Sequence, residues 1–501
     1  MLVLSKEWIS RWLARETATS TERILSRHSS HQSVARLLFD NATTRLLEQS
    51  ASLVLRPHSL MQRAGLAVAR LAMAIAPHAN VIWIPCGPGN NGGDGYEAAR
   101  HLRLWGKCPV VTSLGNTMHL PKDADAARKG ALEAGVCFSD SMPNQYDLCI
   151  DALFGIGRIR PFDATCSAWI QHINYCPAPV LAIDVPSGLD ADTGSGGSLC
   201  INADVTLSLL TLKPGLFTAD GREASGDVWF DDLGIAQPTS AYAQLGGPLL
   251  PPSRAHNTHK GSYGDVTIIG GSPGMTGAAL LAGRAALHGG AGRVYVSLLD
   301  CAALALDIGQ TELMFRPLSE LAYKSMTVVA GCGGGQAIAS HLADILDHSD
   351  RLVLDADALN AIAQDTTLQD RLRARRVGAT VLTPHPLEAA HLLKLETHAV
   401  QANRLSAAQA LADRFGCTIV LKGSGSIIAA PGVVPHINPS GNARLASAGT
   451  GDVLAGLIGA RLAAGGEIFH STCESVYRHG AIADTWPQRN TLTAQGLARA
   501  L

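Results

Sequence analysis

Short apolar runs alternate with segments of helical apolar spacing along most of the chain. The first run, Val81 to Ile84, is followed by Ala98, Ala99 and Leu102 at helical spacing, which predicts a buried strand leading into a helix. Further runs occur in "PVVTSL", "YDLCIDALFG", "VLAIDVPSG" and "DVTLSLL", and residues 37–75 have the spacing of two amphipathic helices. This alternation is typical of a parallel sheet with crossover helices, so we expect an α/β fold.

The pattern stops near residues 244–257, where "QLGGPLLPPSRAHN" contains two glycines and three prolines. Such a stretch is typical of a linker, and a second α/β series follows it. The 501 residues also exceed what one hydrophobic core usually serves. We therefore predict an N-terminal extension (1–36), a first α/β domain (37–245), a linker (246–257) and a second α/β domain (258–501).

The composition of the chain indicates which classes of partner and which cell compartment to expect. A net charge of -2 gives no electrostatic reason to expect nucleic acid or a membrane surface as a partner. The 11 cysteines are odd in number and scattered, with no C-x-x-C pair, which argues against a disulfide framework or a zinc site and favours the cytoplasm. The Arg-rich start resembles a transit peptide in composition, but Glu7, Glu16 and Glu22 favour a poorly ordered extension or an over-long start instead.

The first strand leads into a glycine-rich turn in "GPGNNGGDGYEAARHL". Gly87, Gly89 and Gly92 have the G-x-G-x-x-G spacing of a dinucleotide-binding turn. The acidic residue that should hold a ribose after the next strand is missing from "CPVVTSLGN", whereas Asp94 lies within the turn itself. We therefore do not expect this turn to hold NAD as a hydride-transfer cofactor.

Polar residues gather at three predicted strand ends in the first half. They are Asn90, Asn91 and Asp94 in the first turn, Asp151 in "DALFGIG", and Asp184 with Ser187 in "AIDVPSGLDADTG". Each alone is more often a turn former or a helix cap, but together their carboxylate, amide and hydroxyl oxygens favour a hard-cation site. Glycines 155 and 157 also allow backbone N–H groups to approach an anion.

"SAGTGDVLAG" is the sharpest motif of the second half. Backbone N–H groups of Gly449, Thr450 and Gly451 can hold a phosphate at the positive end of the following helix. Asp452 can then take a proton. A purely structural interpretation makes Asp452 a helix cap, but capping does not require the G-T-G ahead of it.

The motifs "GPGNNGGDGYEAARHL", "DALFGIG" and "IDVPSGLDADTG" resemble the NAD(P)H-hydrate epimerase family, from near Phe39 to the end of the first half. The resemblance implies a Rossmann-like three-layer domain that interconverts the R and S forms of hydrated NADH and NADPH, with Asp184 as the acid or base. It implies substrate contacts on Asn90, Asn91, Gly92, Gly93, Asp94, Gly155, Ile156, Gly157, Arg158, Ile159, Arg160, Pro161 and Asp184. It also implies potassium bound by Asn91, Asp151 and Ser187. Ile156 stands where the family more often has a small polar residue.

The G-x-G-D turn resembles the ribokinase-like fold, whose members transfer phosphate to a hydroxyl group. With "LDADALN", "LTPHPLEAAHLL" and "LKGSGSIIAAP", the chain from about His259 resembles the ADP-dependent NAD(P)H-hydrate dehydratase family. That resemblance implies nucleotide contacts on Lys422, Gly423, Ser424, Gly425, Ser426 and Gly451. It implies that Ala278, Gly333, His385 and Asp452 face the hydrated nicotinamide. "GCGGG" at 331–335 departs from the family's G-P-G-L-G, and Leu387 from its H-P-G-E.

Two of these residues also have structural interpretations. The prolines of "TPHP" would order His385 in a turn regardless of function. Lys422 could be a solvated cation at a strand end, and only the glycines after it favour a nucleotide site.

The two resemblances together predict a repair enzyme whose epimerase feeds the S hydrate to the dehydratase. ADP is the expected co-substrate, and magnesium is expected with its phosphates, although no protein ligand for magnesium stands out. We also expect a homo-oligomer. The alternatives are a small-molecule hydroxyl kinase fused to a Rossmann-like binding module, or an N-terminal half that binds or dimerises without catalysis.

Overall fold

A computed structural model describes residues 21–25, 36–115, 117–157, 161–248, 256–300 and 305–501. The chain forms two compact units, the first built mainly from residues 37–242 and the second from residues 243–501. Of the predicted segments, most of the extension (1–20 and 26–35) and residues 249–255 of the linker lie outside the described residues.

The first unit contains an eight-stranded sheet in the order β1-β9-β8-β7-β6-β3-β4-β5. Every neighbouring pair is parallel except β1 and β9. The strands are β1 (Thr21–Leu25), β3 (Val81–Cys86), β4 (Cys108–Ser113), β5 (Cys137–Ser139), β6 (Leu148–Asp151), β7 (Val180–Ile183), β8 (Val205–Leu209) and β9 (Asp227–Asp231); β2 (Arg36–Leu38) lies close to the boundary between the units along the chain.

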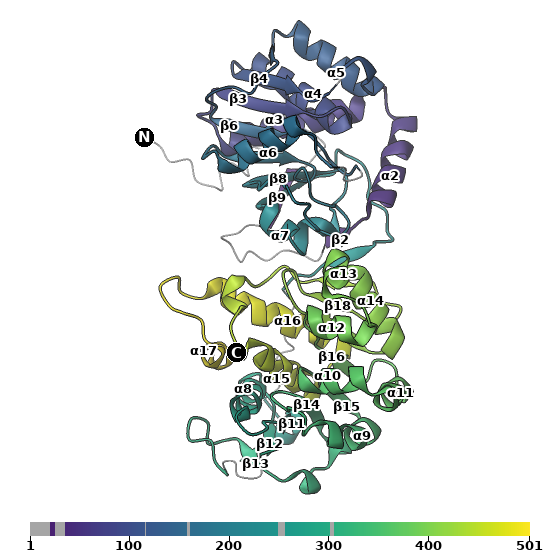
Figure 1. Cartoon of the computed structure of the whole chain (residues 1–501), viewed down its shortest axis with the longest axis vertical. Helices are drawn as coiled ribbons and strands as arrows, with labels where there is room; N and C mark the ends of the chain where they lie inside the picture. The colour runs from purple at the N-terminus through teal and green to yellow at the C-terminus, as the bar shows by residue number, and fades with distance from the viewer. Residues whose placement is uncertain (1–20, 26–35, 116, 158–160, 249–255, 301–304) are drawn as a thin grey trace. The chain divides into compact units, whose positions relative to one another are not determined.

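Helices cover both faces of this sheet (Figure 1). They are α2 (Asn41–Val54), α3 (Ser59–Ile75), α4 (Asn90–Leu104), α5 (Lys122–Glu133), α6 (Ala164–Tyr175) and α7 (Gly221–Ala224), with 3-10 turns at Thr117–His119 and Pro214–Phe217. Because side chains alternate along β3, Ile82 and Ile84 join the core beneath α3 and α4, while Trp83 packs edge-on against Trp169 of α6. The central sheet is therefore buried between two helical layers.

One expectation about the extension is wrong within the described residues. Thr21–Leu25 forms β1, which pairs antiparallel with β9, and Thr21 Oγ1 donates to Asp231. This segment therefore has tertiary contacts, because an edge strand of the sheet offers it free backbone partners.

The strands of the second unit lie in the order β13-β12-β11-β14-β15-β16-β17-β18-β19-β10. They run parallel from β13 to β17, and β18 is antiparallel to both its neighbours. They are β10 (Ala243–Leu245), β11 (Asp265–Gly270), β12 (Arg293–Leu298), β13 (Met314–Phe315), β14 (Thr327–Ala330), β15 (Arg351–Leu354), β16 (Thr380–Leu382), β17 (Thr418–Leu421), β18 (Ile427–Ala429) and β19 (His436–Ile437).

Helices α8 and α15 pack together on one side of this sheet, joined by α16 and α17, and the α9 to α14 series lies on the other side (Figure 1). They are α8 (Thr276–His288), α9 (Ala339–His348), α10 (Asp357–Gln364), α11 (Thr366–Ala374), α12 (Pro386–Leu393), α13 (Thr397–Ala402), α14 (Arg404–Phe415), α15 (Thr450–Ala463), α16 (Ile468–Thr485) and α17 (Ala494–Arg499). Short 3-10 turns occur at Lys260–Tyr263, Leu318–Glu320, Tyr323–Ser325 and Ala443–Leu445.

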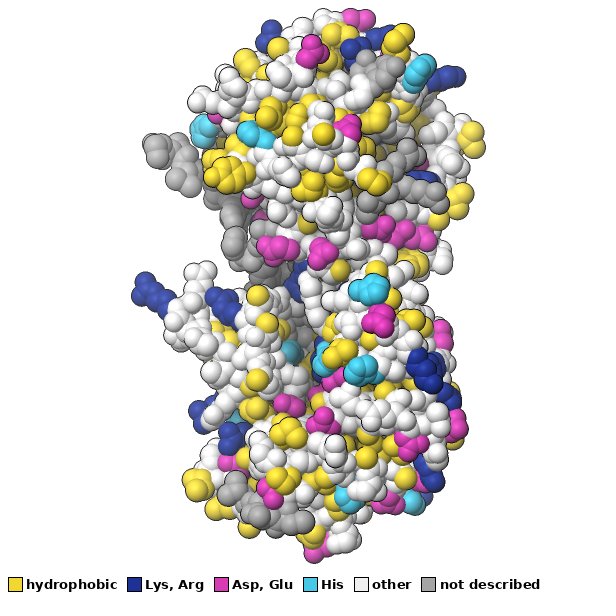
Figure 2. All heavy atoms as spheres, in the orientation of Figure 1, with side chains coloured by type: hydrophobic (Ala, Val, Ile, Leu, Met, Phe, Trp, Pro, Cys, Tyr) yellow, Lys and Arg dark blue, Asp and Glu magenta, His cyan; other side chains and the backbone are white. Residues whose placement is uncertain are grey.

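The α/β fold class predicted from the apolar pattern is confirmed in both units. Within the described part of the chain, no helix has the length and apolar character needed to cross a membrane. Acidic and basic side chains are interspersed on the face of the molecule in Figure 2, as the net charge of -2 leads one to expect. The cytoplasmic location stays a prediction.

Candidate active sites

A cavity of about 730 Å³ lies in the first unit, where β3, β6 and β7 end. It is lined by the predicted residues Asn90, Asn91, Asp94, Gly155, Ile156, Gly157, Pro161 and Asp184. Four further predicted residues are buried and lie within a few residues of the lining along the chain: Gly92, Gly93, Asp151 and Ser187. The predicted residues Arg158, Ile159 and Arg160 lie outside the described residues. Three separate strand ends thus contribute to one cavity.

The glycines of the first turn allow close backbone packing. A Cβ on Gly92 would lie 2.0 Å from the Gly87 carbonyl oxygen, and one on Gly87 would lie 1.8 Å from the Leu153 carbonyl oxygen. Gly89 is the N-cap of α4, so Asn90 to Asp94 form its first turn rather than a loop. The motif therefore aims the N-terminus of α4 at the cavity.

Asp184 is held in an unusual backbone conformation beneath this cavity. Its φ is +66°, a region that non-glycine residues rarely adopt without a local reason. Its Oδ1 accepts from the Leu209 N–H at 3.0 Å and from the Lys213 ammonium, which also donates to the Leu209 carbonyl oxygen at 2.6 Å. Lys213 is fully buried, so Asp184 has an ion-pair partner on its inner side.

Asp94 faces the same cavity in a different electrostatic state. Burial raises the pKa of its carboxyl well above the usual range, and the charges of Asp184, Glu48 and Glu97 raise it further. The pKa of Glu48, which also lines the cavity, is raised by burial and then by Asp184. The cavity therefore contains two acids in different surroundings: Asp94, whose carboxyl lies among other acids, and Asp184, which is paired with Lys213.

Asp151, at the end of β6, and Ser187, after β7, form a buried oxygen cluster. Ser187 Oγ donates to Asp151 Oδ1 at 2.7 Å, and the Ser187 N–H donates to Oδ2 at 2.8 Å. Burial raises the pKa of Asp151 to about 6, and no cationic side chain contributes to that pKa. The Asn91 amide nitrogen is buried without a hydrogen-bond partner in the structure. The Asp151 carboxylate, the Ser187 hydroxyl and the Asn91 amide oxygen are the ligand types that hard cations prefer.

In the second unit, four neighbouring strands bring polar side chains to one edge of the sheet. Cys332, Asp355, Thr383 and Lys422 follow the ends of β14, β15, β16 and β17. The Lys422 ammonium and the Thr383 hydroxyl each donate to Asp355 Oδ1 at 2.8 Å. Because these strands are adjacent in the sheet, their carboxyl ends create a compact polar cluster.

The first turn of α15 lies against this cluster. Gly449 is the N-cap, with a φ of +87°, and no side chain caps the helix, so Asp452 is not a capping residue here. Burial, aided by the charge of Asp355 and opposed by a hydrogen bond with Cys332 and the charge of Lys422, raises the pKa of Asp452 to about 6. The carboxylate is therefore poised to accept a proton near neutral pH.

The remaining predicted residues of this site lie on the surrounding elements. Ala278 of α8 and Gly333 are neighbours, since a Cβ on Gly333 would lie 2.9 Å from that of Ala278. Residues 423–426 form the turn between β17 and β18. The buried Arg404 donates to the Leu421 and Lys422 carbonyl oxygens at 3.2 Å, which supports the start of that turn.

His385 has the structural role that the prolines suggest. It is the N-cap of α12, and its Nδ1 accepts from the Leu387 and Glu388 N–H groups at 3.1 and 3.3 Å. Burial lowers its pKa, and Lys422 lowers it further, so the ring is neutral at pH 7. Its Nε2 lies 3.2 Å from Glu388 Oε1, so both ring nitrogens contact groups of the same helix turn.

Cys332, Asp355 and Asp452 could share a metal ion by distance, because their ligand atoms lie within 4.8 Å of one another. Asp355 is already paired with the Lys422 ammonium, and a thiol is a poor ligand for magnesium. The cluster therefore does not fit a dedicated magnesium site.

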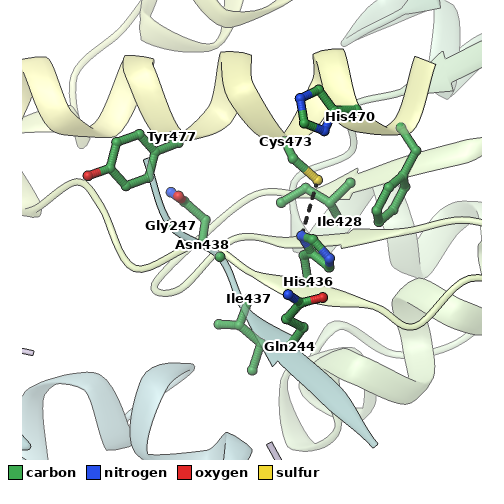
Figure 3. A pocket seen from close by; sticks show the side chains of 11 residues that line it. Gln244, Gly247, Ile428, His436, Ile437, Asn438, His470, Cys473 and Tyr477 are labelled. Atoms are coloured by element: carbon green, nitrogen blue, oxygen red, sulfur yellow. Dashed lines mark hydrogen bonds between the residues drawn. The ribbon is translucent and has the colours of Figure 1, made fainter. Parts of the chain in front are cut away.

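A second cavity, of about 230 Å³, lies between α16 and the edge strands of the second unit (Figure 3). Cys473 Sγ and His436 Nδ1 are 3.5 Å apart there. Burial raises the pKa of the thiol and lowers that of the imidazole. Both groups are consequently neutral, and the pair lacks the thiolate that nucleophilic catalysis needs.

Sequence reasoning missed four polar residues of the two sites. Lys213 and Glu48 flank the acids of the first cavity, and Asp355 and Thr383 complete the second cluster. Asp355 directly follows an apolar run in "RLVLDADALN", so its strand-end position was a usable signal. Lys213 and Glu48 had none, because their contacts join distant parts of the chain.

Each half of the chain matches a known protein family. Residues 57–215 match the family described as YjeF-related protein N-terminus, and residues 266–501 match NAD(P)H-hydrate dehydratase. Among solved structures, the ADP/ATP-dependent NAD(P)H-hydrate dehydratase of Bacillus subtilis is 30% identical, with a TM-score of 0.43, over 50% of this chain and 91% of its own. A ribokinase-like superfamily protein from Enterococcus faecalis is 25% identical, with a TM-score of 0.44, over 50% and 88%.

Similarity also extends across both halves at once. The bifunctional NAD(P)H-hydrate repair enzyme of Escherichia coli is 37% identical over 86% of this chain and 86% of its own length. The enzyme of the same description from Leishmania braziliensis is 34% identical over 95% and 92%. The chain belongs to the family of bifunctional NAD(P)H-hydrate repair enzymes.

Proposed function

We propose that this chain repairs hydrated nicotinamide nucleotides in two steps, each at its own site. The first unit interconverts the R and S hydrates of NADH and NADPH, and the second dehydrates the S form at the expense of ADP, giving NAD(P)H, AMP and phosphate. The observation that carries the proposal is that each unit presents an acid, Asp184 or Asp452, among polar groups at the carboxyl ends of a parallel sheet.

Epimerisation needs proton transfers around the ring carbon that bears the hydroxyl group. Asp184 is the base in this proposal, because it lines the cavity and its carboxylate is held in place by the Lys213 ammonium and the Leu209 N–H. Asp94 is suited to donate a proton, because burial and the neighbouring acids raise its pKa and so favour the protonated carboxyl. Residues 90–94 and 155–161 are proposed to hold the nucleotide.

Potassium is proposed to bind Asn91, Asp151 and Ser187. The buried Asp151 carboxylate lacks a cationic side-chain partner among the described residues, and an uncompensated buried charge is costly. A bound cation would supply positive charge close to the substrate's phosphate groups.

Dehydration needs the ring hydroxyl to become a better leaving group. Asp452 is proposed to take the proton of the ring hydroxyl group while the hydroxyl oxygen attacks the terminal phosphorus of ADP. This attack breaks the bond between that phosphorus and the AMP oxygen. The carbon–oxygen bond then breaks with loss of phosphate, and a proton leaves the neighbouring ring carbon to restore the double bond. Lys422 to Ser426 and Gly451 are proposed to hold the nucleotide, and Ala278, Gly333 and His385 the hydrated ring.

Magnesium is proposed to arrive with the nucleotide, whose phosphates normally carry it. The Bacillus subtilis relative was co-crystallised with ATP and Mg²⁺. A homo-oligomeric state stays a prediction.

Product analysis tests this function against a hydroxyl kinase. With hydrated NADH and ADP, we expect equal amounts of NADH, AMP and inorganic phosphate. A stable phosphorylated hydrate, with no recovery of reduced-nicotinamide absorbance, would instead support a kinase.

A further inference from the structure

Asp355 has no role in the reaction described so far, although it contacts a residue of the proposed nucleotide site. It directly follows β15, and its N–H donates to the Ala330 carbonyl oxygen at 3.0 Å. The next residue, Ala356, has a φ of +48°, a strained conformation that surrounding contacts must maintain. The backbone of Asp355 is therefore fixed.

The side chain of Asp355 is fixed from the two strands that follow in the sheet order. Oδ1 accepts from Thr383 Oγ1, after β16, and from Lys422 Nζ, after β17, each at 2.8 Å. Only 1% of Asp355 is exposed, whereas the Lys422 side chain is 20% exposed. The carboxylate is thus the inner member of the pair, and Lys422 is the partly exposed one.

Both charges lie against the first turn of α15. A Cβ on Gly451 would lie 3.3 Å from Lys422 Nζ and 4.0 Å from Asp355 Oδ2. Gly451 immediately precedes Asp452, and a carboxylate oxygen of each acid lies within 4.8 Å of the other. Asp452 is therefore a competing partner for the Lys422 ammonium.

We propose that Asp355 is a positioning residue of the dehydratase: it anchors the Lys422 ammonium beside Gly451, where the transferred phosphoryl group passes, and keeps it from pairing with Asp452. This inference rests on the proposed dehydration reaction. If Lys422 paired with Asp452 instead, the base would lose proton affinity and the phosphoryl group would lose a cation.

Because charged groups surround Asp452, a change in Asp355 or Lys422 should alter how the dehydration rate depends on pH. The groups that act on it electrostatically are Asp355, Asp357, Lys422 and Cys332. His479 of α16 contacts the Thr450 carbonyl oxygen, but burial lowers its pKa to about 4, so it is neutral. Removing Asp355 should lower the pKa of Asp452, and removing the Lys422 charge should raise it.

The test compares Asp355→Asn and Lys422→Met in the full chain. Initial rates with the S hydrate and varied ADP are measured across about pH 4 to 9, with thermal unfolding of each variant. For Asp355→Asn we expect kcat to fall about tenfold or more and the acid limb of the kcat profile to move to lower pH by about one unit. For Lys422→Met we expect the acid limb to move to higher pH.

The control is Asp307→Asn. This substitution also removes the charge of a mostly buried aspartate, which forms an ion pair with Arg284. It should lower thermal stability without moving the acid limb. Limbs that stay in place in both test variants, or that move in the same direction, would overturn the role of Asp355. Absence of ADP-dependent dehydration in the wild-type protein would instead overturn the proposed function itself.

Discussion

Lys213 illustrates how a single buried side chain can hold a candidate catalytic acid in position. It is fully buried, and it pairs with Asp184 on the side away from the cavity. We expect Lys213→Met to lower the epimerisation rate about 100-fold, the low end of what a positioned acid or base contributes, and to leave dehydration of the pure S hydrate unchanged. NMR or chiral separation of the two hydrates measures the first rate.

The matched control for Lys213 is Lys129→Met, which removes an exposed ion pair with Asp125 on α5. Such pairs contribute little to stability, so both rates should stay at the wild-type level. A folded Lys213→Met protein that epimerises at the wild-type rate would contradict the role given to the pair.

The raised pKa of Asp452 should also affect the stability of the fold. Its pKa is about 6 in the folded protein, against 3.8 for an ordinary aspartate, so the folded state binds its proton more tightly than the unfolded state. The ionised carboxylate therefore destabilises the fold above pH 6, and this cost disappears as the pH falls through 6 toward 4.

We accordingly expect Asp452→Asn to raise the free energy of unfolding by about 2 kcal/mol at pH 8 and to change it little near pH 4. Denaturant unfolding at the two pH values measures the difference. The same variant should lose ADP-dependent dehydration. An equal effect of the substitution at both pH values would show that the buried charge is not its cause.

At the scale of elements, the N-terminus of α4 depends on glycines that let it approach β3 and β6. A Cβ at Gly92 would lie 2.0 Å from the Gly87 carbonyl oxygen, whereas a Cβ at Gly89 has no atom within 4 Å. We expect Gly92→Ala to destabilise the protein by about 2–3 kcal/mol, as overpacking does, and Gly89→Ala by less than about 1 kcal/mol. Equal unfolding midpoints for the two variants would contradict this difference.

Strand ends were predictable from the sequence because each apolar run is followed by a polar residue. That signal located Asp151 and Asp184, whereas the glycine turn located Asp452, and the two helices predicted within residues 37–75 are confirmed as α2 and α3. The ion-pair partners were not predictable, because Lys213 lies 29 residues from Asp184 and Lys422 lies 67 residues from Asp355. Only the sheet order brings them together. The edge pairing of β1 was missed for the same reason.

At the scale of the whole molecule, the proposed function assigns one reaction to each unit, with Asp184 in the first and Asp452 in the second. A dehydratase that accepts one epimer leaves the other untouched, so the fusion makes chemical sense only if the first unit supplies the S form. Two variants that each lack one acid, Asp184→Asn and Asp452→Asn, should therefore complement each other when mixed, because the hydrate can diffuse between molecules.

The most direct test supplies a mixture of R and S hydrated NADH with ADP and follows the return of reduced-nicotinamide absorbance. The account predicts full conversion by the intact protein, conversion limited to the S fraction by Asp184→Asn, and none by Asp452→Asn. A wild-type rate in Asp452→Asn would contradict the dehydratase assignment, and full conversion by Asp184→Asn at the wild-type rate would contradict the epimerase assignment.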